Sequence, residues 1–240
     1  RSLVGSEMCI RDRLCNGMDI QSCFKKANEI DDYIDAHFDY AFDEKYGYKT
    51  TYPTNTGTGM KAGYTLHLPS LSDARRLNDI SAELGRFGLK FRTVYGDGQN
   101  GYGNLYQIST QKTLGQDERE VIKDLDDIVL QIVNQEKEQR EHFYKKDKIQ
   151  MDDEIYKSYG VLKYARKLSL KDSMVLISEL MTGVSLGVLQ FAHNGRYNIN
   201  ELIMDIQPAV LRQNSGKAMS VAETDVLRAE YIRKYLPEII

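Results

Sequence analysis

The stretch 47–69, with the sequence GYKTTYPTNTGTGMKAGYTLHLP, constrains the fold of this chain more than any other segment. It places small hydroxyl residues, an asparagine and several glycines in a turn between two strand-like runs, Lys49–Thr54 and Tyr64–Leu68. Glycine lets a backbone approach a ligand closely, and successive N–H groups in such a loop can hold an anion. The stretch therefore predicts a ligand-binding turn between two strands.

The composition excludes several classes of protein. The 240 residues are 41% apolar and 28% charged, with a net charge of −3, which is ordinary for a soluble globular chain. No apolar run approaches the roughly 20 residues of a membrane helix, and the net charge gives no reason to expect nucleic-acid binding. Neither the cysteines Cys9, Cys15 and Cys23 nor the widely separated histidines have metal-ligand spacing. We expect a cytoplasmic protein with reduced thiols and no metal site.

Apolar periodicity predicts the order of the remaining elements. The expected helices are Ile20–Phe42, Ser72–Phe87 and Gln116–Lys146, and the expected strands are Leu89–Tyr95 and Asn104–Ser109. The polar segment Gln135–Lys148 is expected to project to the surface. From Asp152 onward the pattern is helical, with capping pairs Ser169/Asp172, Asn198/Glu201 and Ser220/Glu223. Successive strands with segregated helices predict an α+β fold with an antiparallel sheet flanked by helices, followed by an all-helical C-terminal region.

Three glycines, Gly96, Gly98 and Gly101, form a G-x-G-x-x-G pattern between two expected strands. A dinucleotide fingerprint should open a helix, but a strand-like run follows here. A protein-kinase glycine loop does lie between strands, yet no H-R-D or D-F-G motif follows this one. Two interpretations remain, a glycine-rich hairpin turn without a ligand and a flexible loop that closes over a nucleotide.

The segment Tyr52–Thr58, YPTNTGT, resembles the Cys-Pro-Thr/Ser-Asn-x-Gly-Thr signature of the ATP:guanido phosphotransferases, the creatine and arginine kinase family. It is most similar to the bacterial branch, the protein arginine kinases, and the resemblance extends from Leu14 to the C-terminus. It implies an incomplete catalytic domain at 14–150 and a helical C-terminal region at 151–240. The N-terminal part of the enzyme would then be absent. Residues 1–13 resemble a translated sequencing adapter more than a native leader.

The resemblance implies a nucleotide site and a catalytic site, with ATP and its Mg²⁺ as ligands. Its nucleotide residues are Lys61, Ala62, Gly63, Tyr64 and Thr65 on one segment, and Arg92, Thr93, Val94, Tyr95, Gly96 and Asp97 on the other. Its catalytic candidates are Arg92, Asn55 and Tyr52. Phosphoryl transfer depends on alignment and charge neutralisation, and an arginine fork pairs with two phosphate oxygens at once. In the alternative interpretation, Arg92 forms an ordinary surface salt bridge.

Two residues depart from the family pattern. Lys61 stands where the family has arginine, so the charge is kept but the bidentate fork is lost. Tyr52 stands where the family has a cysteine, whose thiolate would stabilise a guanidinium, and a tyrosine phenol is larger and ordinarily neutral. These changes predict altered substrate choice, slow turnover or a pseudokinase.

The carboxylate that orients the guanidinium in this family would lie upstream of this chain. We therefore expect the 240 residues alone to be inactive and assign no catalytic base. The acidic residues of the first helical segment read better as a solvated helix face than as a paired-carboxylate site; they are Asp31, Asp32, Asp35 and Asp39.

The segment Thr224–Ala229, TDVLRA, resembles the Arg-Asp-x-x-Arg-Ala motif of protein arginine kinases. There the motif is attributed to a regulatory pocket that binds phosphoarginine, which implies Asp225, Arg228 and Ala229 as its residues here. Thr224 replaces the first arginine. In the alternative interpretation, Asp225 and Arg228 form an ordinary i, i+3 helix salt bridge.

The leading hypothesis is a protein arginine kinase that phosphorylates arginine-containing proteins. The resemblance implies further partners: a Clp protease system, an activator protein, a stress-gene repressor and a second copy in a homodimer. One alternative is a non-catalytic module that binds phosphoarginine or proteins, motivated by Tyr52, Lys61 and Thr224. Another is a kinase of small guanidines, against which the helical tail argues.

Overall fold

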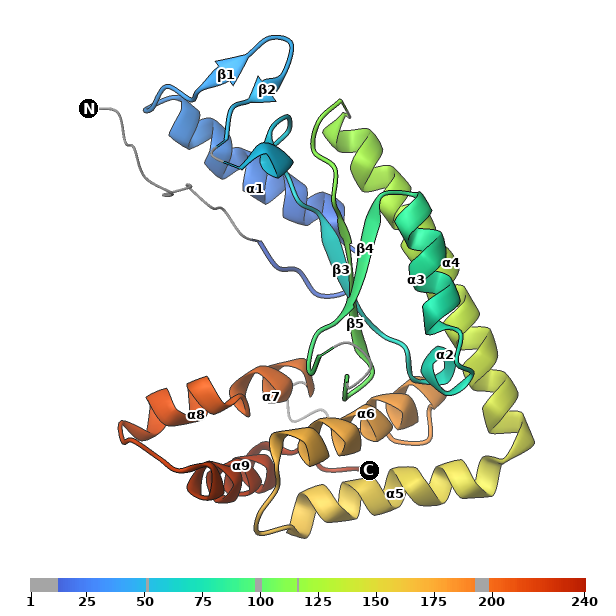
Figure 1. Cartoon of the computed structure of the whole chain (residues 1–240). Helices are drawn as coiled ribbons and strands as arrows, with labels where there is room; N and C mark the ends of the chain where they lie inside the picture. Colours follow the sequence, from blue (N-terminus) through green and yellow to red (C-terminus); the bar gives the residue numbers. More distant parts are fainter. Residues whose placement is uncertain (1–12, 51, 98–100, 116, 193–198) are drawn as a thin grey trace. The chain divides into compact units, whose positions relative to one another are not determined.

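The computed structural model describes residues 13–50, 52–97, 101–115, 117–192 and 199–240 (Figure 1). Its helices are α1 Ile20–Asp35, α2 Pro69–Asp73, α3 Leu77–Arg86, α4 Glu118–Lys146, α5 Lys148–Tyr164, α6 Leu170–Leu186, α7 Ile199–Asp205, α8 Pro208–Ser215 and α9 Val221–Tyr235, with a 3₁₀ turn η1 at Pro53–Asn55. Its strands are β1 Phe42–Asp43, β2 Gly47–Tyr48, β3 Gly63–His67, β4 Leu89–Thr93 and β5 Leu105–Thr110. This α+β composition confirms the predicted fold class.

The chain forms two compact units. The sheet unit comprises the described residues of Arg1–Leu66, Arg76–Arg92 and Gln107–Asn134. The helical unit comprises those of His67–Arg75, Thr93–Tyr106 and Gln135–Ile240. Each unit is described by itself below.

Strand β5 lies at the centre of a three-stranded sheet, between β3 and β4. The Thr110 N–H donates to the Ala62 carbonyl over 2.9 Å, and the Gln111 N–H donates to the Gly88 carbonyl over 3.2 Å. Both pairings are antiparallel, and the turn after β4 returns the chain as β5, so the hairpin expectation is confirmed. Because a strand follows the glycine pattern, the dinucleotide-fingerprint interpretation is excluded.

One face of this sheet is buried against α4. Tyr64 and Leu66 of β3 and Ile108 of β5 are buried, as expected for alternate residues of a half-buried strand. The Tyr64 hydroxyl donates to the Asp126 carboxylate on α4, and burial followed by this bond raises the pKa of Tyr64. An apolar stripe on α4 supplies the other side of this core, with its buried residues Ile122, Leu125, Val129 and Ile132.

The segment before the signature differs from the prediction. Helix α1 ends at Asp35 rather than at residue 42, and Phe38 is 70% exposed, so a longer helix would have had no core to pack against there. The chain forms the β1–β2 hairpin instead. Lys49–Thr54 is not a strand among its described residues, because Pro53 lacks an N–H donor and begins the 3₁₀ turn η1.

The predicted helix Ser72–Phe87 is two helices. Helix α2 begins at Pro69 rather than at Ser72, and Arg75, with a φ of 57°, breaks the helix before α3. The end is as predicted, because Gly88 adopts a φ of 73° directly after α3.

A buried ion pair contradicts the expectation that Gln135–Lys148 projects to the surface. Glu136 and Arg140 are only 2% and 9% exposed, and they form a 2.9 Å salt bridge. The Glu136 carboxylate also accepts the N–H groups of Ser70 and Leu71, the first turn of α2, at 3.0 and 2.9 Å. These donors have no partner within their own helix, so a buried carboxylate is stabilised there.

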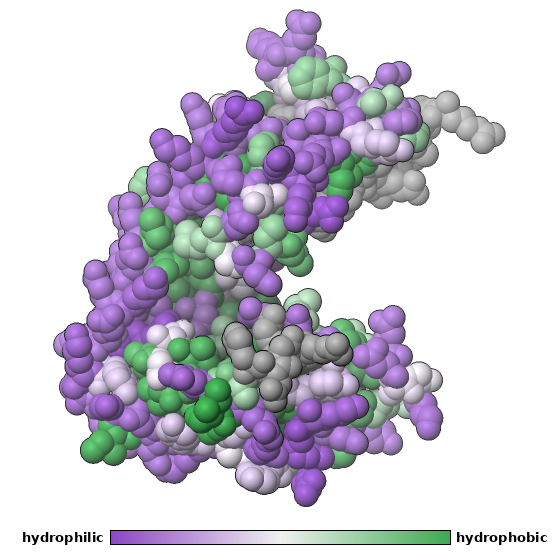
Figure 2. Space-filling model, turned by 180° about the vertical axis from the view of Figure 1, so that it is seen from behind, coloured by the Kyte–Doolittle hydropathy of each residue, from purple (hydrophilic) through white to green (hydrophobic). Residues whose placement is uncertain are grey.

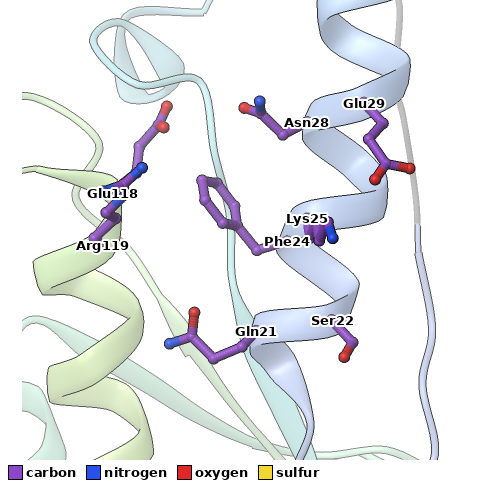
Figure 3. A pocket seen from close by; sticks show the side chains of 8 residues that line it. All are labelled: Gln21, Ser22, Phe24, Lys25, Asn28, Glu29, Glu118 and Arg119. Carbon is purple, nitrogen blue, oxygen red and sulfur yellow. The ribbon is translucent and has the colours of Figure 1, made fainter.

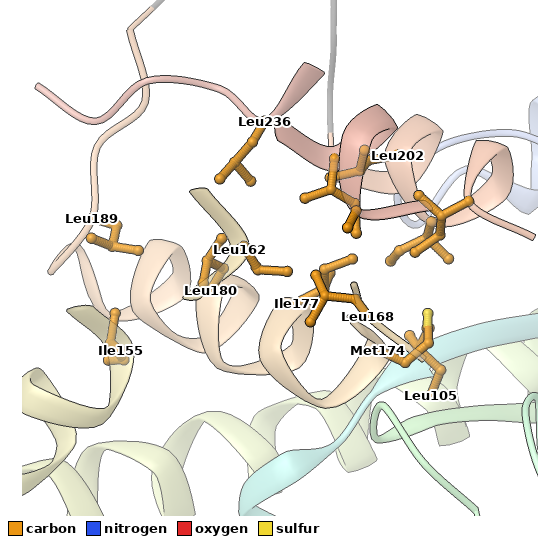
Figure 4. Close-up of a cluster of buried hydrophobic side chains, with 14 residues drawn as sticks. Leu105, Ile155, Leu162, Leu168, Met174, Ile177, Leu180, Leu189, Leu202 and Leu236 are labelled. Carbon is orange, nitrogen blue, oxygen red and sulfur yellow. The ribbon is translucent and has the colours of Figure 1, made fainter. Parts of the chain in front are cut away.

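The helical unit is built on the α5–α6 pair; α9 packs on α5, α7 packs on α6, and α8 packs on α7 and α9. Its core is one apolar cluster that includes Leu162, Ile177, Leu180 and Leu202 (Figure 4). Two predicted caps are confirmed: Ser169 accepts the Asp172 N–H, and Ser220 with Glu223 forms a full capping box. The third, at Asn198, lies outside the described residues.

Cys15 and Cys23 form a disulfide, which differs from the expectation of reduced thiols. Cys15 lies before α1 and Cys23 in its first turn, and their Cα atoms are 6.1 Å apart, within disulfide range. Hydrophilic residues cover most of the face drawn in Figure 2. Among the described residues, none of the helices is long and apolar enough to span a bilayer.

Candidate functional site

The signature loop, Tyr52–Thr58, is hydrogen-bonded to the segment that follows β5. The Thr113 hydroxyl donates to the carbonyls of Thr56 and Thr54 at 2.7 and 3.1 Å, and the Thr58 N–H donates to the Thr113 carbonyl at 2.9 Å. Gly57 has a φ of 114°, and a Cβ there would overlap the Thr113 carbonyl oxygen. Glycine is therefore required at this position, and the loop is held in one conformation.

We expect Gly57→Ala to lower the free energy of unfolding of the sheet unit by roughly 2–3 kcal/mol, through strain and the clash with Thr113. Gly115→Ala is the matched control, because Gly115 also has a positive φ (76°) but has open space around its Cβ position. It should cost only about 1 kcal/mol. Urea unfolding of both variants measures the difference, and equal costs would contradict a steric role for Gly57.

The two signature candidates Tyr52 and Asn55 point to different surroundings. Asn55 is 8% exposed, and its N–H closes the 3₁₀ turn on the Tyr52 carbonyl at 2.9 Å. Tyr52 is 53% exposed. The Asn55 side chain therefore belongs to the interior of the loop, and of the two candidates the Tyr52 ring is the one that a bound molecule could reach.

The nucleotide candidates 61–65, on β3 and the two residues before it, divide between the two faces of the sheet. Ala62 and Tyr64 are buried on the α4 side, whereas Lys61, Gly63 and Thr65 are exposed. Successive strand residues point to opposite faces, so Ala62 and Tyr64 could contribute only backbone atoms to a ligand on the exposed face.

Arg92 lies on that same exposed face. From the hydrogen bonds of Thr110 and Gln111, the antiparallel register places Thr65 and Arg92 on either side of Gln107. The Arg92 Nε–H donates to the Gln107 Oε1 at 2.7 Å, which agrees with this register. A neutral amide rather than a carboxylate contacts the guanidinium, so its charge is not neutralised by this contact. The salt-bridge interpretation of Arg92 thus finds no support among the described residues.

The same register places Gly63 and Lys90 on either side of Ser109. Lys90 and Lys61 are exposed, and none of the described residues on this face is acidic. We name it the cationic face, defined by Lys61, Thr65, Lys90, Arg92, Gln107 and Ser109. Lys90 was not among the sequence candidates, although its alternation with Arg92 in a predicted strand was a sufficient signal. Point charges and a guanidinium around uncharged donors suit a polyphosphate anion.

The other nucleotide candidates, Thr93–Asp97, belong to the helical unit. The Thr93 hydroxyl donates to the Gly96 carbonyl at 3.3 Å, and the Tyr95 ring stacks on Tyr102 with centroids 6.2 Å apart. Both tyrosines pack against the helical core, and burial raises the pKa of Tyr95. Val94 and Asp97 are exposed. Tyr95 is therefore a packing residue. Gly96 and Asp97, in the turn after it, are exposed.

A hydrogen-bond network that the sequence did not predict holds the base of the β4–β5 hairpin. The Asn104 amide donates to the Ser178 hydroxyl at 3.1 Å, and the His67 Nε2 lies 2.8 Å from the same oxygen. Burial, followed by the charge of Arg140, lowers the pKa of His67 to about 3. Only the fold brings these residues together, because they lie on β3, the hairpin and α6.

We expect this histidine to make the protein acid-sensitive. Its folded-state pKa, about 3, lies below the ordinary value of 6.5. Between these two pH values, His67 is therefore protonated in the unfolded chain but neutral in the native state. Stability that is fully present above pH 6.5 is therefore lost as the pH falls toward 3, by about 1.4 kcal/mol per pH unit at most. Urea unfolding of wild type and His67→Gln across this range isolates the effect. Parallel curves for the two proteins would contradict it.

The Thr224–Ala229 motif, here called the tail motif, forms a buried contact between α9 and two other segments, here called the junction. Arg228 is 1% exposed; its Nε–H donates to the Ile206 carbonyl at 3.0 Å, and its Nη1 donates to the Leu168 carbonyl and the Asp225 carboxylate at 2.9 and 2.6 Å. The Thr224 hydroxyl donates to the Ser220 carbonyl at 2.8 Å. The i, i+3 salt bridge exists and is largely buried within α9, and the two backbone hydrogen bonds of Arg228 join α9 to the segments that follow α7 and precede α6.

A cavity of about 710 Å³ lies between α1 and the start of α4. Phe24 and Gln21 project into it from α1 toward Glu118 and Arg119 (Figure 3). A second cavity, of about 310 Å³, lies between Leu89, Thr110 and α4. Neither includes a residue of the cationic face, which is an open surface. Their mixed linings do not define a ligand class.

Comparison with known proteins identifies the class. Residues 12–139 match the ATP:guanido phosphotransferase, C-terminal catalytic domain, and residues 148–239 match the protein-arginine kinase McsB C-terminal domain. The chain is 39% identical over 220 residues to the protein-arginine kinase of Bacillus subtilis, covering 92% of this chain and 60% of that protein. It is 39% identical to the protein-arginine kinase of Clostridium kluyveri, covering 93% and 64%. Taurocyamine kinase from Schistosoma mansoni matches with 29% identity and a TM-score of 0.41, over 47% of this chain and 16% of that one.

The chain belongs to the ATP:guanido phosphotransferase family. The resemblance seen in the signature and in the tail motif is thereby confirmed. The chain spans only about 60% of the length of the Bacillus relative. The predicted domain limits, 14–150 and 151–240, and the nature of residues 1–13 stay predictions.

Proposed function

We propose that the complete protein transfers the γ-phosphoryl group of Mg-ATP to arginine guanidinium groups of proteins. The cationic face carries this proposal: Arg92 lies on β4 and Lys61 just before β3, and none of the described residues on that face is acidic. The signature loop is held rigidly by Thr113. Such a surface would bind the phosphates, while Tyr52 would border the acceptor. Mg²⁺ would arrive with the nucleotide, bound through its phosphates.

The biological setting belongs to the same proposal. The protein-arginine kinases to which the chain is similar suggest protein substrates. We place the protein in the cytoplasm, with a Clp protease system, an activator protein, a stress-gene repressor and a second copy as its partners. Asp225, Arg228 and Ala229 are the proposed phosphoarginine pocket. A ligand there would compete with the carbonyls and the carboxylate that Arg228 now contacts.

The direct test combines the complete protein with Mg-ATP and an arginine-rich protein. We expect acid-labile phosphate on arginine, identified by mass spectrometry, and faster turnover in the Lys61→Arg, Tyr52→Cys variant, which restores the family pattern. Free arginine as the acceptor separates a kinase of small guanidines. If neither wild type nor the double variant gives an acid-labile product, the activity is not that of a kinase. Phosphoarginine binding without nucleotide binding would then assign the binding-module role.

A further inference from the structure

Lys90 stands on the cationic face without an assigned role. It is exposed on β4, opposite Ser109, in the row next to the one that joins Arg92 to Gln107 and Thr65. Residues two apart on a strand are separated by roughly 7 Å and point to the same side. Lys90 and Arg92 are therefore adjacent cations on one strand. Lys61, across the sheet and two residues before the start of β3, is the third.

The centre of the cationic face is uncharged, and this indicates which kind of anion the face could bind. The middle strand contributes Gln107 and Ser109, which are half-buried and can donate hydrogen bonds but carry no charge. Cations on β4 and just before β3, on either side of a neutral polar centre, match an anion that lies across the strands and bears several charges. A single carboxylate or monophosphate would need only one of them.

Lys61 stands where the family has arginine, and this difference favours a contribution of Lys90 to phosphate binding. A lysine at this position offers one compact charge and no planar fork, so a phosphate chain would lose one of its two-oxygen contacts. A second lysine on the same face adds a point charge, which partly offsets that loss. Lys90 carries its charge within the strand that also carries Arg92.

We propose that Lys90 is a third phosphate-binding residue, which contacts the polyphosphate chain of the nucleotide together with Lys61 and Arg92. This rests on the proposed function, since it requires that the cationic face is the nucleotide site. A different role would be protective: lysine on a strand at the edge of a sheet discourages pairing with other chains. That role makes no demand on nucleotide affinity, so the two can be distinguished.

The test is calorimetric binding of Mg-ADP and of AMP to the complete protein and its variants. We expect Lys90→Gln to weaken Mg-ADP binding roughly fivefold and AMP binding less than about twofold, with the Mg-ADP effect shrinking as salt is raised. Lys90→Arg should keep the affinity. The matched control is Lys112→Gln, which changes an exposed lysine just beyond β5 and should leave both affinities unchanged.

A second comparison tests the link to Lys61. In a Lys61→Arg background, we expect Lys90→Gln to weaken Mg-ADP binding less than about twofold, because the restored fork replaces the missing contact. If Lys61→Gln and Arg92→Gln weaken binding but Lys90→Gln does not, Lys90 is not a phosphate ligand and the proposed function stands. If wild type binds no nucleotide at all, both the proposed function and the role of Lys90 are overturned.

Discussion

Replacing Arg92 by alanine is expected to lower kcat/KM for protein phosphorylation by about 10³-fold, the lower end of what a phosphate-neutralising arginine contributes to phosphoryl transfer. Arg92 is exposed, and among the described residues its Nε–H donates to the neutral Gln107 amide and its neighbours on the cationic face are uncharged or cationic. Its charge is therefore available to the transferred phosphoryl group. Initial rates of arginine phosphorylation at several ATP concentrations provide the measurement.

Two variants separate the role of Arg92 from its charge and from the fold. Arg92→Lys keeps the charge but loses the fork, so its rate should fall between wild type and Arg92→Ala. Arg86→Ala removes an exposed arginine from the last turn of α3 and should leave the rate unchanged. A loss below about tenfold in Arg92→Ala, with the fold intact, would contradict a role in charge neutralisation.

Arg228→Met is expected to lower the free energy of unfolding of the helical unit by about 3–5 kcal/mol. The side chain is almost completely buried, and it satisfies two backbone carbonyls and the Asp225 carboxylate. Methionine fills similar space but leaves these three acceptors without their donor, and a buried unpaired carboxylate is costly. Urea unfolding followed by circular dichroism measures the loss.

The control for this prediction is Arg212→Ala, which removes an exposed arginine from α8 and should change stability by less than about 0.5 kcal/mol. Asp225→Asn should cost less than Arg228→Met, because Arg228 keeps both carbonyl partners. If Arg228→Met costs under about 1 kcal/mol, the junction does not stabilise the unit, and the motif would be free to serve ligand binding alone.

The strands were predictable because burial of one face of a sheet makes apolar and polar residues alternate along each strand. Tyr64 and Leu66 alternate with exposed residues, and the glycines between β4 and β5 indicate a turn, so the hairpin and the antiparallel sheet could be expected. The stripe of α4 and the caps at Ser169 and Ser220 are equally local patterns. Each depends on residues within a few positions of one another.

The polar interior could not be predicted in this way. Glu136 and Arg140 lie in a segment that is polar all round, and only the folded chain reveals that Glu136 accepts N–H groups from the distant start of α2. His67, Asn104 and Ser178 likewise meet only in three dimensions. For the site, the family pattern indicated Lys61 and Arg92, but the strand register was needed to place them on one face and Ala62 and Tyr64 on the other.

The most direct test of the central claim is amide hydrogen exchange of the complete protein with and without Mg-ADP. We expect slower exchange at Gly63–His67, at Leu89–Thr93 and in the signature loop, because these segments form the cationic face and its border. Phosphoarginine, added separately, should change exchange in α9 instead. Protection by Mg-ADP confined to the cavity between α1 and α4, or no protection anywhere, would contradict a nucleotide site on the cationic face.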